Sequence, residues 1–119
     1  PIFAIGCETD HIAAWKHSYR GIQLMGSKEK KFILAESGHI AGIINPPDKN
    51  KYGYYLNQDL TLNSESWRKK ASYLTGSWWP EWEKWVKFYS GNQVEARKEG
   101  SKSYPPLSDA PGSYVLKKS

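Results

Sequence analysis

The spacing of apolar residues changes twice within the first forty positions, and each change predicts a different element. Residues 2–5, IFAI, form a short apolar run of the kind typical of a buried strand. From residue 11 to residue 25, apolar side chains recur every three or four positions, as on one face of an amphipathic helix, and Asp10 could cap it. Residues 31–35, KFILA, predict a second strand. The pattern therefore predicts a strand–helix–strand unit.

Beyond this unit the pattern is less regular. Residues 41–60 carry prolines and glycines and predict an ordered loop, with a short extended piece at 52–56. Residues 64–74 and 77–89 predict two helices, each preceded by a polar capping residue and followed by glycine. We expect one face of the second helix to pack against the sheet through its aromatic residues, Trp78, Trp82, Trp85 and Tyr89.

The chain divides into two parts on this pattern. Residues 1–90 carry all the predicted strands and helices, whereas residues 91–119 lose periodicity and predict an extended tail. The fold class is therefore α/β, with a βαβ unit followed by a loop and two helices.

Composition limits the function classes. The 119 residues suffice for one modest core. The net charge is +5, but the lysines are scattered and diluted by acids, so we expect no nucleic-acid partner. No apolar run approaches the ~20 residues of a membrane span, and no zinc-finger spacing indicates a metal site. A single cysteine, Cys7, suits a reducing, cytoplasmic compartment. Because the chain begins at Pro1, with no Met and directly at a predicted strand, we interpret it as a fragment of a larger protein.

Two polar residues fall where the predicted strands end. Strands joined by a helical crossover lie parallel, so their carboxyl ends meet at the edge where open α/β sheets bind ligands. Asp10 follows the first strand and His39 follows the second. An acid followed by a histidine at this edge matches the order of the last two members of an α/β-hydrolase triad.

Four motifs carry a more specific resemblance. DHIAAW, SGHIAGIINPP with the following KNK, GSWWPEW and the closing APGSYV occur in this order between Ile2 and Val115. Together they resemble the C-terminal part of a polyhydroxyalkanoate (poly-3-hydroxybutyrate) synthase, most closely the class that uses one type of subunit on short-chain substrates. Two stretches depart from the family pattern: Ala14 stands where proline is expected, and the tail is looser.

The resemblance implies an α/β-hydrolase core and a polymerising acyltransferase. Such enzymes take (R)-3-hydroxyacyl-CoA, release CoA and lengthen a polyester held on a cysteine through a Cys-His-Asp triad, without a cofactor. By motif position, Asp10 and His39 correspond to the catalytic aspartate and histidine. The aspartate could orient the histidine or activate the substrate hydroxyl, and the sequence leaves both roles open. His11 could line the substrate pocket or simply pack there. The expected location is the cytoplasm, at the surface of polyester granules.

The nucleophile of such a triad is missing from this chain. Cys7 lacks the second glycine of a nucleophile elbow and lies only three residues before Asp10, so we expect it to be a buried apolar side chain. The chain alone should therefore be inactive, and an unpaired first strand should make it self-associate. Two alternatives stay open: a fragment of a serine esterase or lipase, and a noncatalytic module that binds granules or a partner.

Overall fold

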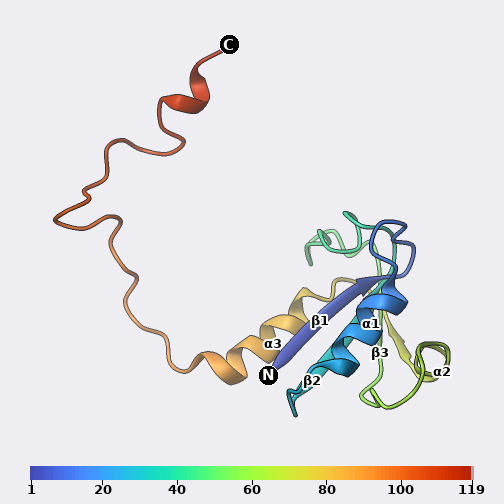
Figure 1. The fold of residues 1–119 in the computed structure, drawn as a ribbon. Helices are drawn as coiled ribbons and strands as arrows, with labels where there is room; N and C mark the ends of the chain where they lie inside the picture. Colours follow the sequence, from blue (N-terminus) through green and yellow to red (C-terminus); the bar gives the residue numbers. More distant parts are fainter. Residues whose placement is uncertain (119) are drawn as a thin grey trace.

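The predicted strand–helix–strand unit is present in the computed structural model, which describes residues 1–118. Strand β1 (Ile2–Cys7), helix α1 (Trp15–Leu24) and strand β2 (Lys30–Ala35) follow one another (Figure 1). The two strands pair in parallel, from Ile2 opposite Lys30 to Cys7 opposite Ala35. Their carboxyl ends therefore lie side by side.

Two short strands extend the sheet on the far side of β2. Strand β3 (Tyr54–Leu56) pairs antiparallel with β2, and strand β4 (Ser72–Leu74) pairs antiparallel with β3, giving the order β1-β2-β3-β4. The extended piece expected at 52–56 is thus confirmed. The helix expected over 64–74 is wrong in its last part: helix α2 ends at Lys70, and the next residues pair with β3.

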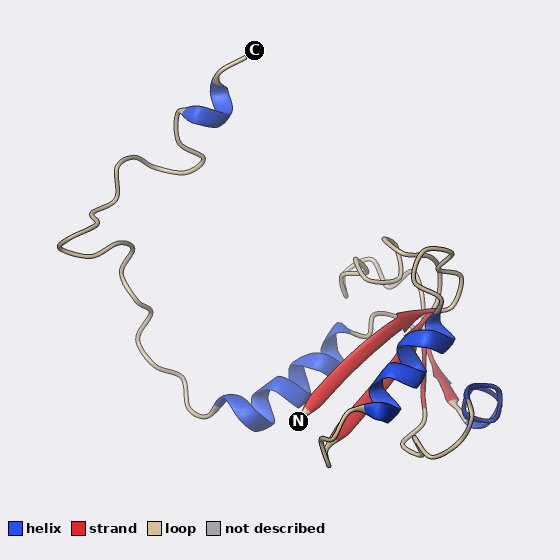
Figure 2. Ribbon diagram, viewed as in Figure 1, coloured by secondary structure: helices blue, strands red, loops and turns tan. Residues whose placement is uncertain are grey.

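Helices cover both faces of this mixed sheet (Figure 2). Residues of β2 alternate between the two faces, as strand geometry requires. Helices α1 and α2 (Ser64–Lys70) lie on one face, where their aromatic residues surround Phe32 and Leu34. The start of helix α3 (Trp79–Ser90) lies on the other face, over Ile33 and Ala35. The chain is therefore a small α/β domain with its two cores on opposite sides of β2.

The aromatic stripe of α3 is only partly a core element, contrary to expectation. Trp78 is buried just before the helix, and the rings of Trp78 and Trp85 contact Phe3 of β1 at centroid distances of 6.4 and 5.4 Å. Trp82 is 46% exposed and Tyr89 is also exposed. Helix α3 runs alongside β1 (Figure 1), and the hydroxyl of Tyr89 near its end still donates to the Glu29 carboxylate, so the stripe follows the sheet while part of its aromatic surface stays open to solvent.

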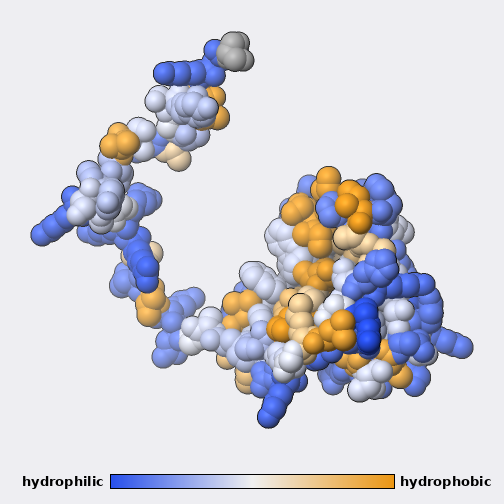
Figure 3. Space-filling model, in the orientation of Figure 1, coloured by the Kyte–Doolittle hydropathy of each residue, from blue (hydrophilic) through white to orange (hydrophobic). Residues whose placement is uncertain are grey.

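Residues 91–118 run away from this body (Figure 1). They contain one short 3-10 helix (Tyr114–Leu116), and apolar groups are spaced among hydrophilic ones along their length (Figure 3). Among residues 1–118, no helix has the length and apolar character needed to cross a membrane.

Candidate functional site

Two loops leave the sheet where β1 and β2 end, and backbone hydrogen bonds hold them together. The amide of Glu8 donates to the carbonyl of Ala35 at 2.8 Å, and the amide of Thr9 donates to that of Ser37 at 3.1 Å. The parallel ladder is thus continued past the strands. This pairing brings the segment that carries Asp10 against the segment that carries His39.

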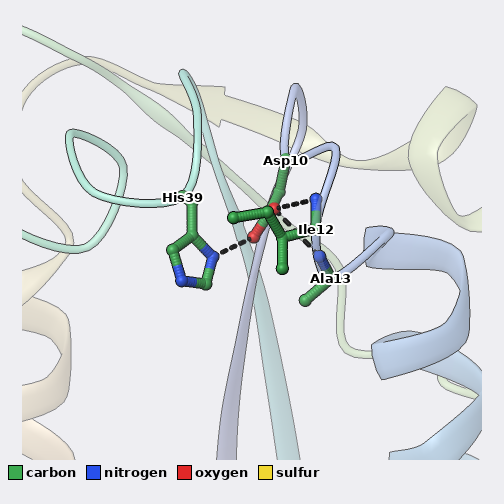
Figure 4. Close-up of polar contacts among 4 residues, drawn as sticks. All are labelled: Asp10, Ile12, Ala13 and His39. Atoms are coloured by element: carbon green, nitrogen blue, oxygen red, sulfur yellow. Dashed lines mark hydrogen bonds and ion pairs between the residues drawn. The ribbon is translucent and has the colours of Figure 1, made fainter.

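Asp10 and His39 form a direct pair at this edge (Figure 4). The Oδ2 atom of Asp10 lies 2.7 Å from Nδ1 of His39, although the residues are 29 positions apart. The Oδ1 atom of Asp10 accepts the amides of Ile12 at 2.8 Å and Ala13 at 2.9 Å. A carboxylate at Nδ1 favours the tautomer with its proton there, which leaves Nε2 free to accept one. In Figure 4 this second nitrogen faces away from Asp10.

The two side chains differ in exposure and charge. The Asp10 side chain is 6% exposed, whereas that of His39 is 50% exposed. The backbone amide of Ala13, the hydrogen bond from His39 and the amide of Ile12 together lower the pKa of Asp10 to about 2. The carboxylate is therefore ionised at neutral pH. The pair therefore consists of a half-exposed imidazole that is hydrogen-bonded to an ionised, nearly buried carboxylate.

Two tryptophans fix the loop that carries His39. The indole N–H of Trp78 donates to the carbonyl of Gly42, and that of Trp79 donates to the carbonyl of Ile43, both at 3.0 Å. The Asn45 side chain closes the loop further on by donating to the carbonyl of Tyr52 at 2.9 Å. Sequence reasoning placed Trp78 in a packing stripe and gave Trp79 no role, and it missed both as donors, since no local pattern relates them to the loop.

The predicted capping role of Asp10 is wrong. Helix α1 begins at Trp15 with Ala14 at its N-cap, and no side chain caps it. Asp10 instead closes a turn of its own with the amides of Ile12 and Ala13, ahead of the helix. That turn leaves its other carboxylate oxygen facing His39, so the same residue serves the pair instead of the helix.

The remaining candidates lie outside the pair. Cys7 is buried on the face of the sheet that the start of α3 covers. This burial and, to a smaller extent, the charge of Asp10 raise the pKa of its thiol. A buried thiol with a raised pKa is a poor nucleophile, as expected for this residue. His11 is exposed, and no hydrogen bond joins it to Asp10 or His39 in the described part of the chain. Within residues 1–118, no group of three or more His, Cys, Asp or Glu side chains is arranged to hold a metal.

The fold and the pair define a small α/β domain with an ionised aspartate and a histidine joined at the carboxyl edge of two parallel strands. No family model matches the chain. Known relatives are nevertheless found. The chain is 40% identical over 118 residues to a poly(3-hydroxyalkanoate) polymerase subunit of Rhizobium etli, covering 99% of this chain and 18% of the relative.

Two further relatives agree. Poly(3-hydroxyalkanoate) polymerase 2 of Ectopseudomonas oleovorans is 43% identical over 115 residues, 96% of this chain and 20% of its own length. The polymerase subunit of Cupriavidus necator is 38% identical over 119 residues, 99% of this chain and 20% of its own length. The chain thus spans about a fifth of the length of these relatives. The resemblance to polyhydroxyalkanoate synthases is confirmed over nearly the whole chain.

Proposed function

We propose that this chain is the C-terminal part of a polyhydroxyalkanoate synthase, an acyltransferase with an α/β-hydrolase core that polymerises (R)-3-hydroxyacyl-CoA. The observation that carries the proposal is the contact of 2.7 Å between Asp10 and His39, in a chain similar almost end to end to poly(3-hydroxyalkanoate) polymerases. The substrate and the growing polyester are then its partners, together with the rest of the enzyme. The expected location is the cytoplasm, at the granule surface.

His39 supplies the base in this proposal. Its Nε2 takes the proton from the thiol of a cysteine that lies outside this chain, and the thiolate attacks the thioester carbonyl of the substrate. A new carbon–sulfur bond forms to the enzyme, the bond to CoA breaks, and His39 returns the proton to the departing CoA sulfur. The 3-hydroxyl group of the enzyme-bound acyl unit then attacks the thioester carbonyl of the next substrate. A carbon–oxygen bond forms, the carbon–sulfur bond to CoA breaks, and the hydroxyl proton passes through His39 to the departing CoA sulfur, so the chain grows by one ester.

The environment of Asp10 favours orientation over direct action on the substrate. One carboxylate oxygen is occupied by His39 and the other accepts two backbone amides, and the side chain is 6% exposed. A carboxylate with a pKa of about 2 is also a weak base. We therefore assign Asp10 to holding the His39 tautomer and stabilising the imidazolium. His11, exposed beside Asp10, is left as a residue that could contact substrate.

A chimeric polymerase tests this function. The 119-residue chain replaces the matched segment of the Cupriavidus necator polymerase subunit, and CoA release from (R)-3-hydroxybutyryl-CoA is followed with a thiol reagent. His39→Gln should lower kcat at least ~100-fold, the usual range for loss of a general base. Asp10→Asn should also lower it strongly, because an amide donating to Nδ1 selects the tautomer that cannot accept a proton at Nε2.

His17→Gln provides the matched control, since this histidine is exposed on α1. It should leave kcat within twofold of the parent chimera. An inactive parent chimera, or a His39→Gln chimera with the activity of His17→Gln, would overturn the proposal. A cysteine rather than a serine in the nucleophile elbow of the full-length protein separates this function from the esterase alternative. The noncatalytic alternative predicts granule binding that survives both site substitutions.

A further inference from the structure

Two further carboxylates, Glu8 and Glu36, lie between the ends of β1 and β2 and the residues of the Asp10–His39 pair. The β1–β2 register ends with Cys7 opposite Ala35, so Glu8 and Glu36, the next residue of each segment, lie side by side. By alternation along the strands they share the face of Leu34, on which α1 and α2 pack. Two neighbouring carboxylates repel each other unless each has its own partner.

Residues from α2 and β4 supply these partners. The Nε atom of Arg68 donates to Oε1 of Glu8 at 2.8 Å, and both side chains are about 30% exposed. The hydroxyl of Tyr73 donates to Oε2 of Glu36 at 2.8 Å. The same oxygen accepts the amide of Gly53 at 2.7 Å, which closes the loop that carries His39. Each carboxylate is therefore tied to an element outside its own loop.

Tyr55 joins the two partners. The guanidinium carbon of Arg68 lies 3.2 Å from the centroid of the Tyr55 ring, within the range of a stacked cation–π contact. The Tyr73 ring lies beside it on the neighbouring strand, with centroids 5.0 Å apart. Arg68, Tyr55 and Tyr73 thus form one cluster, here called the Tyr55 cluster. It reaches Glu8 at one end and Glu36 at the other.

We propose that the Tyr55 cluster positions Asp10 and His39 relative to each other through Glu8 and Glu36. Glu8 lies two residues before Asp10, and Glu36 lies three residues before His39. Besides the Asp10–His39 contact itself, the segments that follow β1 and β2 are joined by the backbone hydrogen bonds that the amides of Glu8 and Thr9 donate. Arg68 and Tyr73 therefore act as positioning residues that touch neither member of the pair. The kinetic consequence rests on the proposed function, whereas the geometric one does not.

Nuclear magnetic resonance of the full 119-residue chain tests the geometry. With labelled histidine, the unmodified chain should show a protected Nδ1 proton on His39, held by Asp10. Arg68→Gln and Tyr73→Phe should each lose that signal. Tyr89→Phe is the matched control, because it removes a tyrosine hydroxyl that bonds Glu29 at the opposite end of the sheet. This control should keep the signal.

Kinetics of the chimeric polymerase supply the second readout. Arg68→Gln should lower kcat about tenfold with KM within twofold, since a displacement of 1 Å can cost ~100-fold and the backbone bonds remain. Arg68→Lys keeps the charge but loses the planar stack on Tyr55, so it should restore only part of the loss. Tyr73→Phe removes one oxygen atom and decides the matter if Arg68→Gln does not fold.

Two outcomes separate the possible failures. If Arg68→Gln and Tyr73→Phe keep both the Nδ1 proton and the kcat of Tyr89→Phe while unfolding at lower temperature, their role is structural and the inference fails. If the parent chimera is inactive but the variants lose the Nδ1 proton, the positioning inference stands and the proposed function fails.

Discussion

Gly42 lies at a tight point of the loop that carries His39, and adding one methyl group there should destabilise the fold. A Cβ at this position would lie 2.6 Å from Sγ of Cys7, 2.8 Å from the carbonyl oxygen of Glu36 and 3.0 Å from that of Gly38. Ordinary carbon contacts begin near 3.5 Å, so the sulfur and two backbone oxygens would all have to move. The carbonyl of Gly38 is held by the amide of Gly42 itself, at 2.9 Å.

The expected cost follows from this geometry. Overpacking of a tight site costs typically about 1–3 kcal/mol, and about 1 kcal/mol shifts Tm by ~4 °C in a domain of this size. Gly42→Ala should therefore unfold about 4–12 °C below the unmodified chain, as followed by tryptophan fluorescence on heating. Cys7→Ala in the same chain should recover part of the loss by removing one of the three clashing atoms.

Gly21→Ala is the control of opposite sign. Gly21 lies inside α1 and an added Cβ meets nothing within 4 Å. Alanine in a helix interior is favoured over glycine by about 0.5–1 kcal/mol, so this variant should unfold at a higher temperature. The reasoning is refuted if Gly42→Ala matches the unmodified chain within about 0.3 kcal/mol, a margin well below the overpacking range, or if both variants shift in the same direction.

Three further outcomes are expected from the same structure. Trp67→Ala should lower the free energy of unfolding in urea by about 3–5 kcal/mol, because this side chain is fully buried and its indole N–H satisfies the carbonyl of Asn57; a loss below ~1 kcal/mol would contradict this packing. The lowered pKa of Asp10, about 2, adds stability above the ordinary aspartate pKa of 3.8 that is lost as pH falls toward 2. Asp10→Asn should remove this part of the acid dependence. A carboxyl resonance of Asp10 itself that titrates near pH 3.8 in the unmodified chain would refute this prediction. Strand β1 pairs on one side only within residues 1–118, so the isolated chain should self-associate, and a single monomeric boundary in sedimentation at micromolar concentration would count against this.

The strand–helix–strand unit could be read from the sequence because its signals are local. Apolar runs and three- to four-residue spacing define β1, α1 and β2 without knowledge of any partner. The exact ends of these elements were harder to predict from the sequence. β1 continues through Gly6 and Cys7 because the ladder with β2 extends that far. A Cβ added at Gly6 would lie 3.1 Å from side-chain atoms of Phe32 and Trp15, so glycine suits this close packing.

Elements that depend on distant partners were predicted less well. Ser72–Leu74 continues a helical spacing in the sequence but forms β4, because β3 offers it an open edge. A three-residue strand carries too few positions for periodicity to separate it from a helix end. The aromatic residues of α3 give the same lesson, since a stripe shows which residues share a face but not how deeply each of them is buried.

The position of the Asp10–His39 pair could be predicted because it depends on topology, whereas its precision depends on contacts that sequence spacing does not show. Parallel pairing of β1 and β2 brings their exits to one edge whatever the side chains are. Reaching 2.7 Å requires the turn that Asp10 makes with two amides and the loop that two indole N–H groups hold. Those donors, Trp78 and Trp79, lie at the start of α3, some forty residues after His39. A βαβ unit alone would therefore bring the acid and the histidine near each other, and the helices that follow would set the hydrogen bond between them.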